Sequence, residues 1–227
     1  MASRDTSDPG EAPAGGMTPV VFVVDDDISV RESLEMMIRS IGWQSESFSS
    51  ANAFLASPHL PAPSCLLLDM SMPELNGLEV QKRVAAERPD MPIIFITGYR
   101  DIPMTVQAMK AGAMEFLTKP LQDDTVIDAI SRALERSRAA LGHEARINAL
   151  RVRYASLSQR EREVMALVVT GLLNKQVGGE LGISEVTVKA HRGNVMRKMG
   201  AASLPDLVNI SARLGITGPD QDAPPTA

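Results

Sequence analysis

Four short apolar runs divide the first half of the chain, and each of them ends beside polar residues. The runs read VVFVVDDD (residues 20–27), CLLLDMSMP (65–73), PIIFITG (92–98) and MEFLTKP (114–120). Continuous apolar runs of this length, separated by helix-like segments, are typical of strands that are buried in a parallel sheet. A weaker fifth run, QSESF (44–48), predicts a strand at the edge of that sheet.

Apolar positions with helical spacing lie between these runs. They predict helices at residues 27–41, 51–56, 77–86, 102–111 and from residue 123 onward. Strands that alternate with helices indicate an α/β domain whose parallel sheet is covered on both faces. The carboxyl ends of the strands in such a sheet line one crevice. We therefore expect the side chains that follow the strands to converge.

The helical spacing that begins at residue 123 continues past residue 134, with only Gly142 against it. We interpret it as one long helix that leaves the first domain as a linker; two helices broken near Gly142 are the alternative. The organisation that we expect is a disordered tail at 1–18, a first domain at 19–134, a helical linker at 135–156, a second domain at 157–215 and a disordered tail at 216–227.

The second domain reads as four helices, at residues 159–170, 174–181, 185–199 and 204–214. Ser158 and Glu161 have the spacing of a capping box, and Ser184 and Ser203 stand in N-cap positions. The breaks between the helices fall at Gly171, Gly182 and Gly200.

Charge is distributed unevenly along the chain. Residues 1–150 carry a net charge of −8 and residues 151–213 a net charge of +5, which favours nucleic acid as a partner of the second domain; a solvated surface of mixed charge is the alternative. No apolar run approaches the roughly 20 residues of a membrane span. The single cysteine, Cys65, excludes an internal disulfide and predicts a buried thiol. We expect a cytoplasmic protein with no membrane partner.

The crevice of the first domain would collect three carboxylates, a hydroxyl and an ammonium, from Asp25, Asp26, Asp69, Thr97 and Lys119. Carboxylates suit a hard cation such as Mg²⁺, Lys119 can pair with a phosphoryl oxygen, and Thr97 can donate to another. Two chemistries remain open at this point. Asp69 can be a nucleophile that accepts a phosphoryl group, or the acids can hold Mg²⁺ for a separate substrate.

The same runs resemble the receiver domain of two-component response regulators. The resemblance rests on VVDDD, LLLDMSMPELNGLE, IIFITG and EFLTKPL. It also rests on spacing: Asp69 follows Asp26 by 43 residues, Thr97 follows Asp69 by 28, and Lys119 follows Thr97 by 22. It implies a flavodoxin-like, doubly wound, five-stranded parallel sheet, in which Asp69 is the phosphoacceptor.

The resemblance also assigns the other pocket residues by position. It implies a Mg²⁺ site formed by Asp25, Asp26, Asp69 and the backbone carbonyl of Ser71. It further implies a phosphate clamp at Lys119, a switch pair of Thr97 and Phe116, and a cis bond between Lys119 and Pro120.

Residues 172–198 have the spacing of a helix-turn-helix. On its second helix Val188, Val195 and Met199 share one face and should be core. The cationic side chains fall elsewhere, and such a helix would place its N-terminal part in the major groove with cations near phosphates. These side chains are Lys189, His191, Arg192, Arg197 and Lys198.

LSQREREVMALVVTGLLNKQVGGELGISEVTVKAHRGNVMRKMG (157–200) resembles the all-α, four-helix DNA-binding domain of LuxR/FixJ type. The resemblance implies that Lys189 and its neighbours approach bases and that residues 206–213 lie on the fourth, dimerising helix. It places four residues near the DNA backbone, which are Asn174, Lys175, Ser184 and Thr187.

Two features depart from that family. Gly178 and Gly179 replace better helix formers at a cost of roughly 1 kcal/mol each, and Gly193 has no side chain where some members carry a long one. A helical bundle that never binds DNA is the alternative.

Together the two halves predict a FixJ/NarL-type regulator rather than an enzyme. A sensor histidine kinase would phosphorylate Asp69 with Mg²⁺, and the phosphorylated homodimer would bind double-stranded promoter DNA, with RNA polymerase as a further candidate partner. Two rivals are a DNA-binding protein for which phosphorylation is irrelevant and a metal-dependent phosphohydrolase.

Overall fold

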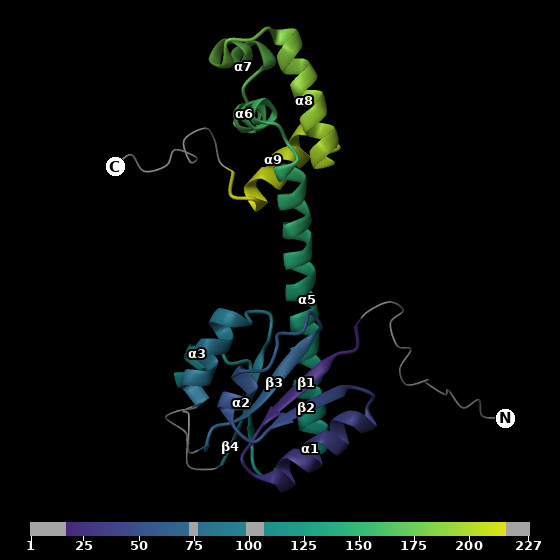
Figure 1. Ribbon diagram of the computed structural model, residues 1–227, viewed down its shortest axis with the longest axis vertical. Helices are drawn as coiled ribbons and strands as arrows, with labels where there is room; N and C mark the ends of the chain where they lie inside the picture. The colour runs from purple at the N-terminus through teal and green to yellow at the C-terminus, as the bar shows by residue number, and fades with distance from the viewer. Residues whose placement is uncertain (1–16, 73–76, 99–106, 217–227) are drawn as a thin grey trace, which may run out of the picture. The chain divides into compact units, whose positions relative to one another are not determined.

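The computed structural model describes residues 17–72, 77–98 and 107–216, and the chain divides into two compact units, Met1–Leu141 and Gly142–Ala227 (Figure 1). The tails expected at 1–18 and 216–227 fall almost wholly outside the described residues. So does most of the helix expected at 102–111, of which residues 107–110 are described and helical.

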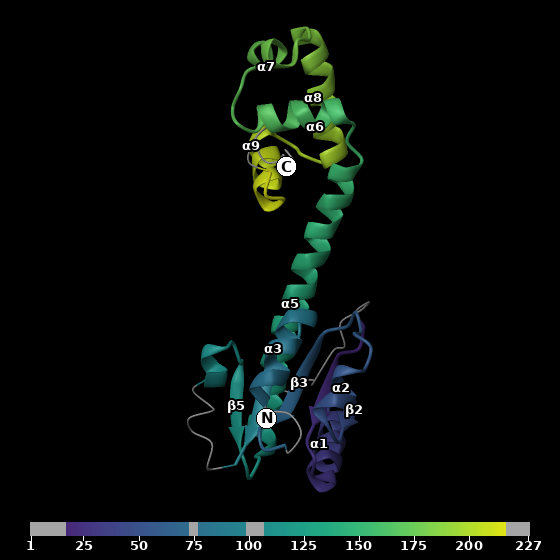
Figure 2. The same ribbon diagram turned by 60° about the vertical axis from the view of Figure 1, so that its left-hand side comes forward.

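Five parallel strands form the sheet of the first unit, in the order β2-β1-β3-β4-β5 (Figures 1 and 2). The predicted five-stranded parallel sheet is therefore confirmed. Its strands are β1 (Val20–Val24), β2 (Gln44–Phe48), β3 (Ser64–Asp69), β4 (Ile93–Thr97) and β5 (Glu115–Thr118). Strands β1, β3 and β4 are buried at every position, which explains their unbroken apolar sequences, whereas the polar β2 lies at one edge.

Successive residues of the central strands alternate between two cores, one on each face of the sheet. Val21 and Val23 pack with α1 (Ile28–Ser40) and α5 (Asp123–Ala155), while Phe22 packs with α2 (Ala51–Leu55) and α3 (Gly77–Glu87). The helices thus cover both faces, as the sequence pattern predicts (Figure 2). The Cys65 thiol is fully buried, as predicted, and burial raises its pKa.

Helix α5 is continuous from Asp123 to Ala155, with no break near Gly142. Its first turns supply Ile130 and Leu134 to the core of the first unit, and its last turns place Leu150 and Tyr154 against the core of the second. None of the helices in the described residues is long and apolar enough to cross a membrane.

The second unit builds its core from the end of α5 and four further helices. These are α6 (Gln159–Val168), α7 (Asn174–Leu181), α8 (Glu185–Met199) and α9 (Leu204–Arg213). The predicted caps are present: Ser158 and Glu161 form a capping box, and Ser184 and Ser203 accept hydrogen bonds from the first turns of α8 and α9.

Candidate functional sites

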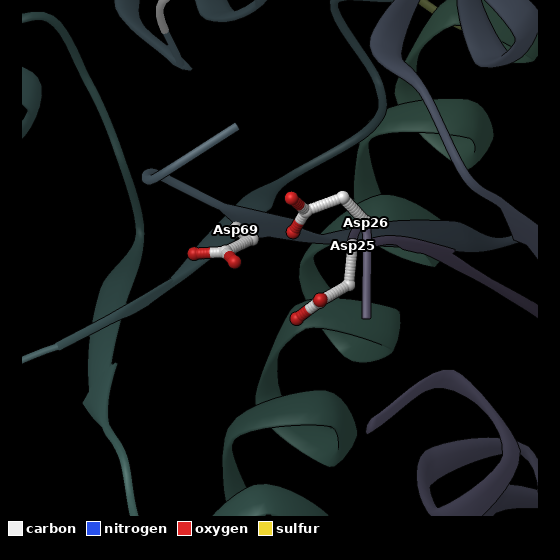
Figure 3. A group of neighbouring side chains, drawn as sticks. All are labelled: Asp25, Asp26 and Asp69. Atoms are coloured by element: carbon white, nitrogen blue, oxygen red, sulfur yellow. The ribbon is translucent and has the colours of Figure 1, made fainter. Parts of the chain in front are cut away.

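Three carboxylates meet where β1 and β3 end (Figure 3). Asp25 and Asp26 follow β1, Asp69 is the last residue of β3, and the two strands are hydrogen-bonded neighbours. One oxygen from each side chain lies within 4.8 Å of the others. Asp25 and Asp69 are buried, whereas Asp26 is exposed, so the cluster has one open side.

The backbone that carries the acid pair is held by Arg31, one turn into α1. Its Nη1 donates to the carbonyl oxygens of Asp25, at 2.7 Å, and Asp26, at 3.1 Å. Asp27, the third acid of the run, accepts from the Ser29 amide and caps α1, as its position suggests. The sequence does not predict these hydrogen bonds of Arg31, because a single cation on an amphipathic helix has no distinctive pattern.

Lys119 brings a positive charge into this cluster from the end of β5. Its Nζ donates to Asp25 Oδ2 at 2.9 Å and to Asp69 Oδ2 at 3.1 Å. Burial acts to lower the pKa of Lys119, but the two carboxylates outweigh it and the pKa is raised. Burial raises the pKa of Asp25, against the hydrogen bonds from Lys119 and the Asp27 amide.

The donor set of the cluster fits a hard divalent cation. All of its ligand atoms are oxygens, and three carboxylates against one ammonium leave a negative charge that a cation can neutralise. Ser71 lies two residues beyond Asp69 and donates its amide to Asp69 Oδ1 at 3.1 Å, so its own backbone is part of the same turn. These residues suit Mg²⁺ better than a soft metal, because no thiolate or imidazole is among them.

Thr97 and Phe116 lie on the two strands next to this cluster. Thr97 ends β4, is buried, and donates its hydroxyl to the carbonyl of Gly98 at 3.1 Å. Phe116 on β5 is half-buried and stacks on Phe95, with ring centroids 5.1 Å apart. The Lys119–Pro120 peptide bond between β5 and α5 is cis, as expected.

In the second unit, α7 and α8 form the predicted helix-turn-helix. Gly182 ends α7 in the left-handed region, at φ 64°. Gly178 explains why the chain departs from better helix formers here: a Cβ on it would lie 2.7 Å from the carbonyl oxygen of Ile183. Glycine at 178 therefore lowers the helix propensity but avoids a clash in the tight turn that follows α7. Nothing lies within 4 Å of a Cβ at Gly179 or Gly193.

Helix α8 separates a core face from an outer face. Val188, Val195 and Met199 are buried, as predicted. The candidate DNA contacts are exposed or half-buried around them: Asn174, Lys175, Ser184, Thr187, Lys189, His191, Arg192, Arg197 and Lys198.

Three of these candidates take part in contacts between different helices of the domain. Lys198 Nζ donates to Glu161 Oε2 at 2.6 Å and to the Ser156 carbonyl at 3.2 Å, and Arg192 Nη1 donates to Asn174 Oδ1 at 3.1 Å. Glu161 is buried, and the hydrogen bond from Lys198 lowers its pKa. Lys198 therefore has a structural contact that its place in a basic run does not predict, whereas Lys175 and Lys189 are exposed.

Comparison with known protein families matches both units. The family of the response regulator receiver domain matches residues 21–131, and the family of bacterial regulatory proteins of luxR type matches residues 155–211.

Similar proteins cover most of the chain. Nodulation protein W of Bradyrhizobium diazoefficiens is 49% identical over 198 residues, 87% of each chain, and the transcriptional regulatory protein FixJ of Rhizobium meliloti is 43% identical over 84% of this chain and 94% of its own.

Solved structures agree. The low-resolution structure of the response regulator StyR has a TM-score of 0.77 at 45% identity and covers 87% of this chain and 100% of its own. Full-length FixJ from B. japonicum has a TM-score of 0.52 at 41% identity and covers 86% of this chain and 97% of its own. The chain thus belongs to the FixJ family of two-component response regulators, in which a receiver domain is joined to a LuxR-type DNA-binding domain, and it is a regulator of transcription rather than an enzyme.

Proposed function

We propose that Asp69 accepts a phosphoryl group from a sensor histidine kinase in the presence of Mg²⁺. The observation that carries the proposal is the convergence of Asp25, Asp26 and Asp69 with Lys119, from the ends of three strands, at one half-open point. An Asp69 carboxylate oxygen forms the new P–O bond, and the P–N bond to the kinase histidine breaks with its electron pair going to that nitrogen.

Each neighbour of Asp69 has a separate role in this proposal. Asp25 and Asp26, with Asp69 and the carbonyl of Ser71, would hold Mg²⁺, which supplies the positive charge that lets a carboxylate approach a phosphoryl dianion. Lys119 moves its ammonium from the carboxylates to a phosphoryl oxygen. Thr97 turns its hydroxyl from the Gly98 carbonyl toward another phosphoryl oxygen.

The switch that we propose follows from the move of Thr97. Phe116 is packed on Phe95 of the same strand as Thr97, so a displacement of β4 and its hydroxyl can be passed to the aromatic ring. Phosphorylation adds roughly −1.5 to −2 charge, and contacts made only in the phosphorylated state would then favour a homodimer. The dimer would bind a two-fold promoter site in the cytoplasm and there meet RNA polymerase.

The domain limits belong to the same proposal. We assign the receiver to residues 19–134, the helical linker to 135–156 and the DNA-binding domain to 157–215. The DNA-binding half is supported by its net charge of +5 over residues 151–213 and by the exposed Lys175 and Lys189 on the helix-turn-helix. In this proposal Lys189 and its neighbours approach bases. The residues that approach the DNA backbone are Asn174, Lys175, Ser184 and Thr187.

The proposal is tested with acetyl phosphate as the phosphodonor. Intact mass spectrometry of the full chain with Mg²⁺ should show one added phosphoryl group, and Asp69→Asn should show none. Asp27→Asn is the matched control, because Asp27 is in the same acidic run but caps α1, and it should be labelled like the native chain. Equal labelling of Asp69→Asn would refute the assignment, and steady turnover of p-nitrophenyl phosphate would favour the phosphohydrolase instead.

A further inference from the structure

The first turn of α8 presents a valine that the protein core does not use. Val186, the second residue of the helix, is 79% exposed, more than any other large apolar side chain in the described residues. Its neighbour two positions on, Val188, is fully buried. Val186 therefore lies on the side of the helix that faces away from the core.

The side chains around Val186 are those of a surface that meets a polyanion. Lys189 is exposed one turn further along the same side, and Lys175 is exposed on α7. Glu185, next to Val186, is also exposed, and a carboxylate is repelled by phosphates but can accept a hydrogen bond from a cytosine amino group. The part of the first turn that carries Glu185 and Val186 thus suits the edges of bases rather than the phosphate backbone.

The position of Val186 is fixed before any ligand arrives. The Ser184 hydroxyl accepts from the Thr187 amide at 3.2 Å and lies 2.8 Å from the Thr187 hydroxyl, so the backbone on both sides of Val186 is capped. A β-branched side chain in a helix has one strongly preferred rotamer. Little conformational entropy is therefore lost when Val186 packs against a partner.

We propose that Val186 is a specificity-determining residue that packs against the 5-methyl group of a thymine in the major groove. The 5-methyl group is the apolar feature that distinguishes thymine on that side of the duplex, and proteins contact it with apolar groups. The N-terminal residues of a recognition helix are the ones that reach base edges. This inference rests on the proposed binding of α8 to DNA and adds the base that its first turn recognises.

The test removes the 5-methyl group of thymine from the DNA and, separately, the side-chain methyl groups of Val186 from the protein. A randomised duplex library is first selected with the full chain, with and without acetyl phosphate and Mg²⁺, to give a binding sequence. Each thymine of that sequence is then replaced by deoxyuridine, which lacks only the 5-methyl group. The dissociation constant of every duplex is measured for the native chain and for Val186→Ser.

We expect one thymine in each half-site at which deoxyuridine weakens the native chain about fourfold, the value of one buried methyl-sized group. The same replacement should have no effect on Val186→Ser, whose affinity for the unmodified duplex should already be reduced. Val152→Ser is the matched control: Val152 is 71% exposed on α5, outside the helix-turn-helix, and the variant should keep the native response to deoxyuridine.

The outcomes separate this inference from the function on which it rests. In one outcome the protein binds a selected duplex, depends on Lys189 for that binding, and yet responds to no deoxyuridine replacement in a way that Val186→Ser abolishes. That result overturns the inference and leaves the DNA-binding proposal intact. A thymine with the same deoxyuridine effect in the native chain and in Val186→Ser also overturns it. A full chain that selects no duplex in either state overturns both.

Discussion

The two units place their charged side chains by different means. In the receiver, Asp25, Asp69 and Lys119 come from three strands and meet only because the sheet aligns the ends of those strands. In the DNA-binding domain, Lys189 and Arg197 are on one helix, and their spacing alone puts them on its surface. The first arrangement depends on the whole fold, and the second on a single capped helix.

This difference has an energetic consequence. Asp25 and Asp69 are buried and the half-buried Lys119 compensates both of them, so removal of its ammonium leaves two poorly solvated carboxylates without this partner. The exposed lysines of the helix-turn-helix are solvated when no DNA is present, and their removal should change binding but not stability. Stability and function are thus coupled in the pocket and separable on the DNA-binding surface.

The largest effect that we expect is the loss of stability in Lys119→Met. Asp25 and Asp69 would then repel each other without the ammonium, at a cost of roughly 2–4 kcal/mol at neutral pH. Trp43 is the only tryptophan and packs against the core of the receiver, so its fluorescence during urea unfolding reports this domain.

The pH dependence of this loss tests its cause. The pKa of Lys119 is raised, so its stabilising contribution is present at neutral pH and is lost only as the pH rises through that pKa. The pKa of Asp25 is also raised, so at lower pH this carboxyl takes up a proton and the penalty in Lys119→Met should shrink. An equal loss at neutral and at acid pH would attribute the effect to packing. The exposed Lys82→Met should have no measurable effect.

A second effect concerns the choice between DNA sequences. Lys189→Ala should lose roughly 1–3 kcal/mol of discrimination between a selected duplex and a random one, if it contacts a base as we propose. Lys175→Ala should weaken both duplexes alike and reduce the slope of log K against log salt by about one. Fluorescence anisotropy over a range of salt concentrations measures both quantities. Equal weakening of all sequences by both variants would show that Lys189 contacts phosphate.

Two neighbouring glycines offer a comparison within a single helix. Gly178→Ala should cost about 2 kcal/mol, because its Cβ would lie 2.7 Å from the Ile183 carbonyl oxygen and the backbone must shift. Gly179→Ala meets no atom within 4 Å and should instead stabilise the helix by roughly 0.5–1 kcal/mol. Thermal unfolding followed by circular dichroism gives both values, and changes of the same sign would contradict the geometry.

These two glycines also show where prediction from sequence ends. Apolar runs and caps predict every described strand and helix, because burial and local hydrogen bonds leave a pattern along the chain. The sequence also brings Asp25, Asp69 and Lys119 together, since the rule for parallel strands is topological. The clash at Gly178 depends on a neighbouring turn, and the contacts of Arg31 and Lys198 depend on the direction of long side chains. The pattern of polar and apolar residues along the chain does not predict such contacts.

The last effect that we expect separates the two functions of Glu161. Its carboxylate accepts from the Ser158 amide at 2.8 Å and from Lys198 at 2.6 Å. Glu161→Gln keeps an acceptor for the capping box but loses the ion pair, and it should cost about 1 kcal/mol at pH 7; Glu161→Ala loses both contacts and should cost more.

The pH dependence of the stability of Glu161→Gln shows whether the ion pair stabilises the domain. The hydrogen bond from Lys198 lowers the pKa of Glu161, so the stabilisation is present above the ordinary value of 4.5 and is lost as the pH falls through the lowered one. The native chain and Glu161→Gln should therefore converge in stability under acid conditions, as measured by the helical signal of the DNA-binding domain. A gap that stays constant down to acid pH would show that Lys198 is not held by this carboxylate and is available to contact DNA like Lys175.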